Sequence, residues 1–236
     1  MPLERAFVLH RRRYRETSLI VDLFSAESGR LSAVAKGALR NKSPLRAGIQ
    51  PLVPLTVETR GRGDLQTLVR AEPADPPFQL AGIALFSALY ANELLMKLLA
   101  PNEPVPELFE SYAQLLETMA EDARIAPGLR KFEMDLLQAM GVNVPLTVTA
   151  DSGEAVQSEQ RYRFIVEYGV VAADSSAAGI PVLGGTLQAL SNGTYPDADT
   201  ARQAKRLTRH VLDRYLDGRP IMARELFRDA KLPRRR

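Results

Sequence analysis

The chain has 236 residues, of which 45% are hydrophobic and 25% are charged, so it can bury a substantial core as one large or two small domains. It has no cysteine and only two histidines, which excludes a disulfide and a thiolate metal site. No run of about 18 apolar residues could cross a bilayer, and Arg11, Arg12, Arg13 and Arg15 stand where a signal peptide would be apolar, so we expect a cytoplasmic protein.

Charge is divided unevenly along the chain, although the formal net charge is only +3. Residues 1–80 hold 13 Lys/Arg and 8 Asp/Glu, residues 81–201 hold 6 and 16, and residues 202–236 hold 12 and 4. The N-terminal and C-terminal regions are basic and the middle of the chain is acidic. This pattern indicates two surfaces that bind a polyanion and a third region with a different function.

The first part of the chain has the pattern of strands, because short β-branched segments alternate with turn residues. The expected strands are Arg5–His10, Thr17–Phe24, Arg30–Lys36, Leu52–Glu58 and Leu65–Glu72. Five strands of this size predict a small closed barrel of the OB-fold type over residues 1–78. Pro51 and Pro54 should mark an edge or a bulge in the fourth strand.

After a proline-rich segment, the hydrophobic residues recur with the period of an α-helix. Residues 79–145 are therefore expected to form a helical bundle. Residues 146–185 read as a small irregular β segment, and residues 186–236 as C-terminal helices with a basic tail. The expected helices are Gly82–Ala100, Val105–Ala120, Pro127–Met140, Thr186–Ser191, Asp199–Leu216 and Met222–Asp229. The expected fold class is therefore α+β: an N-terminal five-stranded OB-fold barrel followed by a mainly helical C-terminal domain.

Signatures of catalysis are absent from the sequence. There is no GxxxxGK[ST] phosphate loop, and Gly61 and Gly63 lack the third glycine of a dinucleotide fingerprint. His10 and His210 do not share a helix face on which they could bind a metal. The middle of the chain has so many acidic residues that some carboxylates will lie close together by chance. We therefore interpret such pairs as part of a solvated surface. We expect a protein without catalytic activity, metal or cofactor.

The basic clusters carry the stronger signal for function. OB-folds bind single strands through loops and a sheet face that supply cations for the phosphates and aromatic rings for the bases. The candidate DNA-binding residues on the barrel are Arg11, Arg13, Tyr14, Arg15, Lys36, Arg40, Lys42 and Arg46. Two other interpretations stay open, namely that Tyr14 only packs in the core or at its rim and that the cations only keep the surface soluble.

A second basic stripe lies near the C-terminus. Arg202, Arg206 and Arg209 share one helix face by their spacing, and Asp213 continues that face. The stripe is either a phosphate contact or a solvated face in which Asp213 pairs with Arg209. We expect the closing KLPRRR to be a mobile tail that adds electrostatic affinity.

Several blocks spread over Arg5–Asp229 resemble the RecO family of bacterial recombination mediators. They are RAFVLH, ETSLIVDLF, ESGRLSAVAKGA, LYANELLMKLL, LRKFEMDLLQAMG, PDADTARQAKR and GRPIMARELF. The resemblance implies a nucleoid-associated protein that binds single- and double-stranded DNA, anneals complementary strands and, with RecR, loads RecA onto DNA coated by single-stranded-DNA-binding protein (SSB). It implies no catalytic site.

The resemblance also implies two features of the middle of the chain. Some family members hold zinc through four cysteines in the segment that here reads NVPLTVTADSGEAVQ, so this segment should be held by packing alone. Members also bind the acidic, apolar C-terminal tail of SSB in the helical domain. The residues expected to do so here are Arg130, Lys131, Leu94, Leu98, Leu115 and Leu137. Alternatively, Arg130 pairs with Glu133.

The sequence leaves two rival functions open. The chain could be an RNA- or ribosome-associated OB-fold factor whose helical half is only a scaffold, and competition between single-stranded DNA and structured RNA would separate the two. It could also be a nuclease using the acidic middle, which would require cleavage that depends on a divalent metal.

Overall fold

A computed structural model describes residues 3–61, 63–121, 124–174 and 178–229. The chain forms two compact units. The first contains residues 1–123 and 221–236, and the second contains residues 124–220. The chain thus leaves the first unit, forms the second, and returns to the first.

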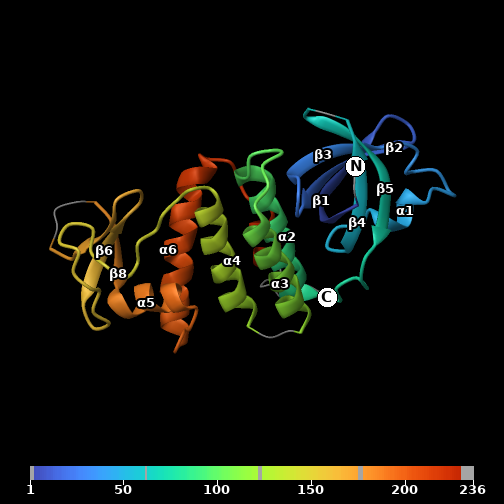
Figure 1. The fold of residues 1–236 in the computed structure, drawn as a ribbon. Helices are drawn as coiled ribbons and strands as arrows, with labels where there is room; N and C mark the ends of the chain where they lie inside the picture. The colour runs from blue at the N-terminus through green and yellow to red at the C-terminus, as the bar shows by residue number, and fades with distance from the viewer. Residues whose placement is uncertain (1–2, 62, 122–123, 175–177, 230–236) are drawn as a thin grey trace. The chain divides into compact units, whose positions relative to one another are not determined.

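Five strands at the N-terminus close into a barrel (Figure 1). They are β1 (Glu4–Tyr14), β2 (Ser18–Ser25), β3 (Gly29–Ala35), β4 (Pro54–Arg60) and β5 (Leu65–Pro73). The order around the barrel is β1-β2-β3-β5-β4, and all neighbours are antiparallel except β3 and β5. This confirms the predicted five-stranded barrel of the OB-fold type.

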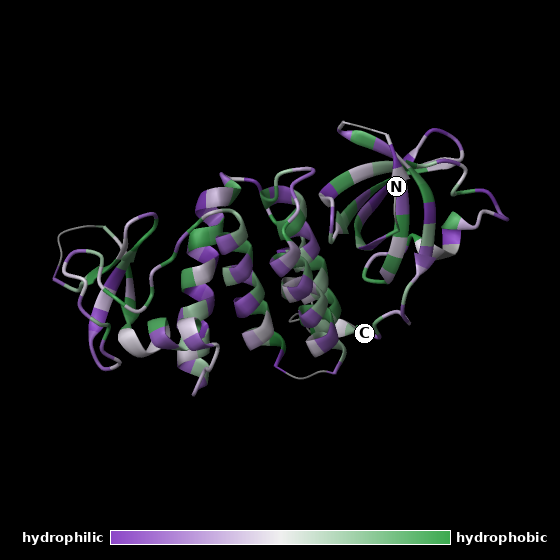
Figure 2. Cartoon of the chain, in the orientation of Figure 1, coloured by the Kyte–Doolittle hydropathy of each residue, from purple (hydrophilic) through white to green (hydrophobic). Residues whose placement is uncertain are grey.

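Hydrophilic and hydrophobic residues are interspersed along the strands of the barrel (Figure 2), and buried hydrophobic side chains form its core. Val21 and Leu23 of β2, Ala33 of β3 and Leu55 of β4 are among its buried core residues. Residues of the connection between β3 and β4, including Leu45 and Ile49, belong to the same core. The connection is therefore packed apolar structure, although its sequence is rich in cations.

The fourth strand differs from its prediction. It begins at Pro54, where a proline removes no internal ladder hydrogen bond, and Pro51 only forms an isolated bridge with Val8. The irregularity in this strand lies between Glu58 and Thr59 instead. The prediction of an edge or a bulge at the prolines was wrong, because Pro51 precedes the strand and Pro54 is its first residue.

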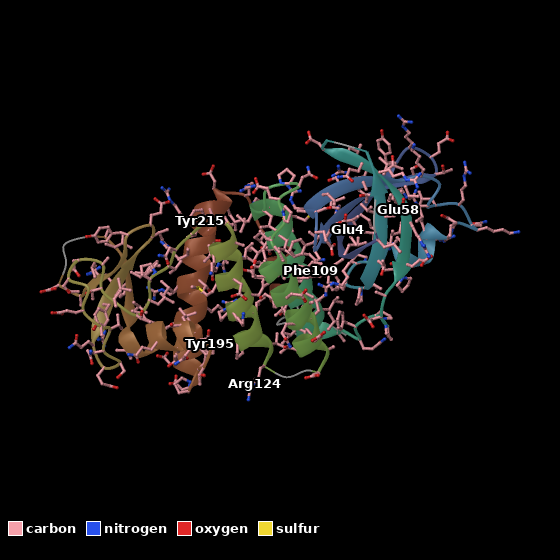
Figure 3. The ribbon with its side chains drawn as sticks, in the orientation of Figure 1. Glu4, Glu58, Phe109, Arg124, Tyr195 and Tyr215 are labelled. Carbon is pink, nitrogen blue, oxygen red and sulfur yellow. The ribbon has the colours of Figure 1, made fainter. Side chains whose placement is uncertain are left out.

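Two helices of the first unit, α2 (Gly82–Leu98) and α3 (Pro106–Ala120), carry the groups that attach to the outer face of the barrel. Phe7 and Phe24 of the barrel lie 5.1–6.0 Å, centroid to centroid, from Phe109 and Tyr112 of α3. Phe109 is labelled in Figure 3. Such aromatic pairs stabilise a contact beyond the area they bury, so they hold the barrel to α3.

Two buried polar side chains complete this junction. Asn92 of α2 donates a hydrogen bond to the Leu9 carbonyl oxygen at 3.0 Å, and the Tyr112 hydroxyl donates to Asn92 Oδ1 at 2.5 Å. Burial raises the pKa of Tyr112, so the phenol stays a neutral donor. An unpaired polar group inside the protein would lower the free energy of unfolding. The network therefore fixes how the barrel packs on the two helices.

A close backbone approach joins the β2–β3 turn to the segment between α2 and α3. Asn102 donates its amide to the Arg30 carbonyl at 2.7 Å, and Arg30 Nε donates to the Leu99 carbonyl at 3.0 Å. A Cβ on Gly29, whose φ is +67°, would lie 1.9 Å from the Glu103 carbonyl oxygen. Only glycine fits at this position.

The last described helix, α7 (Ala223–Asp229), returns to pack on α2. The Glu93 carboxylate of α2 accepts the amides of Met222 and Ala223 at 2.9 and 2.8 Å and pairs with Lys97 at 2.8 Å. Burial alone would raise the pKa of Glu93, but the Ala223 amide, Lys97 and the Met222 amide outweigh it and hold that pKa below its usual value. An ionised Glu93 therefore holds the start of α7.

The second unit combines three helices with a small sheet (Figure 1). The elements are α4 (Ile125–Ala139), β6 (Arg161–Ile165), β7 (Gly169–Ala172), β8 (Ile180–Leu183), α5 (Gly184–Asn192) and α6 (Ala198–Leu216). The sheet order is β7-β6-β8, and α4 packs against α6. The predicted α+β fold class is confirmed, including the small separate sheet.

We expect Glu93→Gln to weaken the docking of α7. The carboxylate has a depressed folded pKa, so its contribution is present above the unfolded value of about 4.3 and is lost as pH falls through the folded value. Near neutral pH the substitution should lower the free energy of unfolding by about 1.5–3 kcal/mol, since it weakens hydrogen bonds to a charged group.

Urea unfolding monitored at neutral pH and near pH 3 tests this expectation. The difference between Glu93→Gln and the parent should shrink at the lower pH, whereas Glu117→Gln, an exposed residue on α3, should change little at either. A difference independent of pH would show that the ionised carboxylate is not what holds α7.

Candidate nucleic-acid interface

The first basic cluster, Arg11, Arg12, Arg13 and Arg15, lies at the end of the first strand and in the turn after it. Strand β1 continues to Tyr14, beyond the predicted end at His10, so the first three arginines are on the strand and Arg15 is in the turn to β2. In the register with β2, Arg11 lies opposite Val21 and Arg13 opposite Leu19. Directly opposed residues share a face of the sheet, so these two arginines are on the face that lines the barrel interior, where β1 leaves the packed core.

The second cluster lies on the connection between β3 and β4, which contains a short helix, α1 (Leu45–Gly48), absent from the prediction. A four-residue helix is too short to show helical periodicity in the sequence. The exposed cations of this connection are Lys36, Arg40, Lys42 and Arg46. A Cβ on Gly48 would lie 2.6 Å from the Ala71 carbonyl oxygen of β5, so the end of α1 sits tightly against the barrel wall.

The fold brings part of each cluster around one hollow of about 400 Å³. Arg11 Nη1 donates to the Ile49 carbonyl at 3.1 Å and so joins β1 to the connection. The residues lining this arginine hollow are Arg11, Arg12, Arg13, Leu19, Ala38, Leu39, Arg46 and Gln50. No carboxylate lines it, so the hollow presents positive charge alone among the described residues.

The cations of the two clusters differ from three other arginines of the barrel strands, Arg5, Arg60 and Arg70. Arg60 pairs with Glu58 and Arg70 with Glu72, while Arg5 pairs with Glu110 of α3. Within the described ranges, the cations of the clusters form no ion pair with a carboxylate; they are Arg11, Arg12, Arg13, Arg15, Lys36, Arg40, Lys42 and Arg46. Their charge is not neutralised locally, so this surface attracts an external anion.

Tyr14 is half-buried at the end of β1. The guanidinium carbon of Arg15 lies 5.2 Å from the centroid of the Tyr14 ring, a cation–π contact. One face of the ring is therefore covered by a cation. A base could stack on the other face or on the guanidinium plane, and the assignment of Tyr14 as a stacking platform stays a prediction.

The C-terminal stripe on α6 is largely engaged in local ion pairs. Arg202 lies 2.6 Å from Asp199, and Arg209 lies 3.6 Å from Asp213, as the alternative interpretation expected. Arg206 is exposed and forms no ion pair with another described residue. The predicted basic tail at residues 231–236 lies outside the described residues.

Arg130 of α4 is buried in the second unit, with 6% of its surface exposed. Its Nη2 donates to Glu133 Oε1 at 2.5 Å and its Nη1 donates to Thr208 Oγ1 of α6 at 3.2 Å. The charges of both partners of this ion pair act on Tyr195, labelled in Figure 3, whose own burial raises its pKa. The structure contains the pairing of Arg130 with Glu133 that was the alternative to binding the SSB tail.

The remaining residues predicted for the tail are distributed over both units. Leu94 and Leu98 lie on α2 and Leu115 on α3 in the first unit, and Leu94 and Leu115 are buried. Leu137 is buried on α4 in the second unit. Buried leucines support their own cores, so none of the three offers an open apolar surface on its own.

Lys131 has a different environment from its neighbour Arg130. Its side chain is 67% exposed, pairs with Asp135 at 2.6 Å and lines a second hollow of about 720 Å³. This α4 hollow is formed by α4, the loop after it and the end of α5, and its apolar lining comes from Met134, Val142, Val144, Pro145, Leu146 and Leu190. Among the described residues, the backbone amides of Asn143 and Val144 have no hydrogen-bond partner.

The segment at residues 143–157 is held by hydrogen bonds as well as by packing, which corrects the expectation of packing alone. Thr149 Oγ1 accepts the Glu154 amide at 3.1 Å and lies 2.8 Å from Ser152 Oγ. Gln188 of α5 donates to the Val156 carbonyl at 2.8 Å. Hydroxyl and amide groups thus close the turn in this chain.

The described part of the chain has neither a metal-binding cluster nor a membrane-spanning helix. No three His, Cys, Asp or Glu side chains come together there as a group that could hold a metal ion. None of the helices there is both long and apolar enough to cross a membrane.

Sequence reasoning missed the apolar and amide residues of the arginine hollow, namely Leu19, Ala38, Leu39 and Gln50. Leu19 could have been found from the strand register, because it lies opposite Arg13. The other three come from an irregular connection, where neither period nor charge distinguishes them from loop residues.

Comparison with known proteins gives a consistent result over the whole chain. The family "Recombination protein O N terminal" matches residues 1–77 and "Recombination protein O C terminal" matches residues 79–225. A protein from Methylococcus capsulatus named DNA repair protein RecO is 43% identical over 228 residues, which are 97% of this chain and 93% of that protein. Proteins with the same name from Vibrio cholerae and Shigella flexneri are 41% and 43% identical, covering 99% and 95% of this chain and 97% and 93% of their own lengths.

We expect Arg130→Ala to destabilise the second unit, because it leaves the Glu133 carboxylate buried without the guanidinium. Breaking a buried ion pair in this way costs about 3–5 kcal/mol. The double variant Arg130→Met/Glu133→Leu should recover most of that loss, since apolar side chains of similar volume remove both charges.

Urea unfolding of the three proteins, with Lys131→Ala as a matched control, distinguishes the two roles of Arg130. The control removes an exposed ion pair and should cost at most about 1 kcal/mol. Equal stability of Arg130→Ala and the parent would mean that the guanidinium is available for a ligand.

Proposed function

Because the chain belongs to the recombination protein O family, we propose that it is a recombination mediator in DNA repair. It binds single- and double-stranded DNA and anneals complementary strands. With RecR it helps to load RecA, indirectly, onto single-stranded DNA coated by SSB. It acts in the cytoplasm at the nucleoid and uses no catalytic residue, metal or cofactor.

One observation carries the DNA-binding part of this proposal. Exposed cations from β1 and from the β3–β4 connection gather at one end of the barrel without a carboxylate to neutralise them, while Arg60 and Arg70 elsewhere on the barrel are paired. A phosphate backbone would displace its counterions on contact with such a surface, which favours binding. The same chemistry accepts single and double strands, because it reads charge and not sequence.

The C-terminal stripe contributes less in this proposal. Arg202 and Arg209 would have to leave their carboxylate partners to contact a phosphate, whereas Arg206 is exposed and ready to do so. Exposed ion pairs are weak, so these arginines can exchange a carboxylate for a phosphate, but the lost ion pair reduces their contribution to DNA affinity.

For the SSB tail, we propose that Lys131, and not Arg130, is the cation that contacts it. Arg130 is engaged with Glu133 and buried, whereas Lys131 is exposed at the α4 hollow. Lys131 pairs with Asp135, which lines the same hollow, so an acidic tail would have to displace this carboxylate. An acidic, apolar tail needs an exposed cation, an apolar wall and backbone amides that can pair with an extended peptide. The α4 hollow has the cation and the apolar wall, and its lining includes Asn143 and Val144, whose amides form no backbone–backbone hydrogen bond with another described residue.

We expect the variant with Arg13, Lys36, Arg40 and Lys42 changed to Ala to bind DNA weakly. Each lost phosphate contact should reduce the slope of log affinity against log salt by about 0.7 for single strands. Fluorescence anisotropy over a salt series measures this, and thermal unfolding should show an intact fold because all four side chains are exposed.

The double variant Arg60→Ala/Arg70→Ala is the matched control, since it removes paired arginines of the same barrel and should leave affinity and slope nearly unchanged. An equal loss of DNA affinity in the two variants would contradict a localised interface.

Competition with structured RNA tests the rival function, and strand annealing in chelator without ATP tests the absence of a cofactor.

We expect Lys131→Glu to weaken binding of an SSB-tail peptide by about tenfold or more, because it replaces the cation at the α4 hollow with a like charge. Binding to bare DNA should be nearly unchanged. Isothermal calorimetry measures the peptide, with Arg161→Glu as a control on an exposed cation of the same unit. Unchanged peptide binding by Lys131→Glu would place the tail elsewhere.

A further inference from the structure

The floor of the arginine hollow is apolar, although its rim is charged. Leu19 is 7% exposed and Ala38 is fully buried in the barrel core, and Leu39 packs against the same core. A phosphate would lose its water over such a floor without gaining a hydrogen bond from it, so the floor suits another part of a nucleotide. A nucleobase has apolar faces that fit the floor.

The hollow is formed before any ligand arrives. The Leu39 amide donates to the Thr17 carbonyl at 2.9 Å, which ties the connection to the start of β2. Arg11 is tied to the Ile49 carbonyl, and Gly48 is in close contact with the Ala71 backbone. A preformed site loses little conformational entropy on binding, so even small contacts contribute to affinity.

The rim supplies groups that match the edge and the backbone of a nucleotide. Gln50 Nε2 lies 3.5 Å from the Arg46 carbonyl, a distance at the limit of a hydrogen bond, so its amide is available to the edge of a base. Guanidinium groups can stack on a base or contact its phosphate. The volume of about 400 Å³ is near the lower end for a small-ligand site.

We propose that the arginine hollow is a socket for one unpaired nucleobase of a single strand, with Leu19 and Leu39 beneath the base and the arginines on its flanking phosphates. This inference rests on the proposed DNA binding and adds a preference to it. A paired base would have to leave its stack at a cost of a few kcal/mol, so the socket favours unpaired nucleotides over duplex. During annealing, the base leaves the socket as it pairs, which loosens the hold on the product.

The test compares a single-stranded oligonucleotide with one of equal length in which abasic tetrahydrofuran residues replace a central run. The two carry the same phosphates, so the slope of log affinity against log salt should be the same. The abasic strand should bind roughly five- to tenfold more weakly, because contacts to the bases are lost.

Two variants locate the effect. Leu39→Ala and Gln50→Ala should each reduce the difference between the two strands and leave the affinity for the abasic strand unchanged. Leu65→Ala, an exposed leucine on β5 away from the hollow, should keep the full difference. Thermal unfolding checks that each variant is folded, and Gln50→Ala serves if Leu39→Ala is not.

The possible outcomes distinguish failure of the socket from failure of the proposed DNA binding on which it rests. Equal binding of normal and abasic strands would overturn the socket and leave DNA binding by the cations intact. Absence of binding to both strands at low salt would overturn the proposed DNA binding itself. A difference that persists in both hollow variants would place the base contact elsewhere and overturn the socket.

Discussion

The parallel pairing of β3 with β5 constrains the whole candidate interface. Because β5 and not β4 lies beside β3, the chain must leave β3 and cross the end of the barrel before β4 begins. That crossing segment places Leu45 and Ile49 in the barrel core and leaves its cations on the outside. The closure that completes the hydrophobic core thus also brings the second basic cluster to the first.

Some arginines of this molecule are exposed and available to an external anion, whereas Arg130 is buried and paired with an internal carboxylate. On the barrel, the arginines around the hollow stay in water, where an unpaired charge costs little and remains available to an anion. On α4, Arg130 is taken out of water and is held by Glu133 and Thr208. The side chain is the same, but removal from water requires an internal partner.

The junction between the barrel and α3 explains how a small barrel can present a fixed surface. The aromatic contacts of Phe109 and Tyr112 and the Asn92 hydrogen bond hold the outer face of β1 and β2, away from the end of β1 that carries the arginines. Gly29 allows a further backbone contact from the β2–β3 turn. Strand β1 is therefore anchored along one part and exposed along another, which suits a rigid binding element.

The sequence by itself determined the closed barrel, the mainly helical remainder with its small sheet and the family, because alternation and helical periodicity are local consequences of which face is buried. It also located the cations, since charge is read directly from composition. Only the tertiary structure decided which charges face outward: Arg130 and Lys131 are adjacent in sequence, yet one is buried against Glu133 and the other lines a hollow. Likewise, Leu39 and Gln50 join the arginines only through the crossing at the barrel end. Pairing and burial depend on contacts between distant residues, and no local pattern in the sequence encodes them.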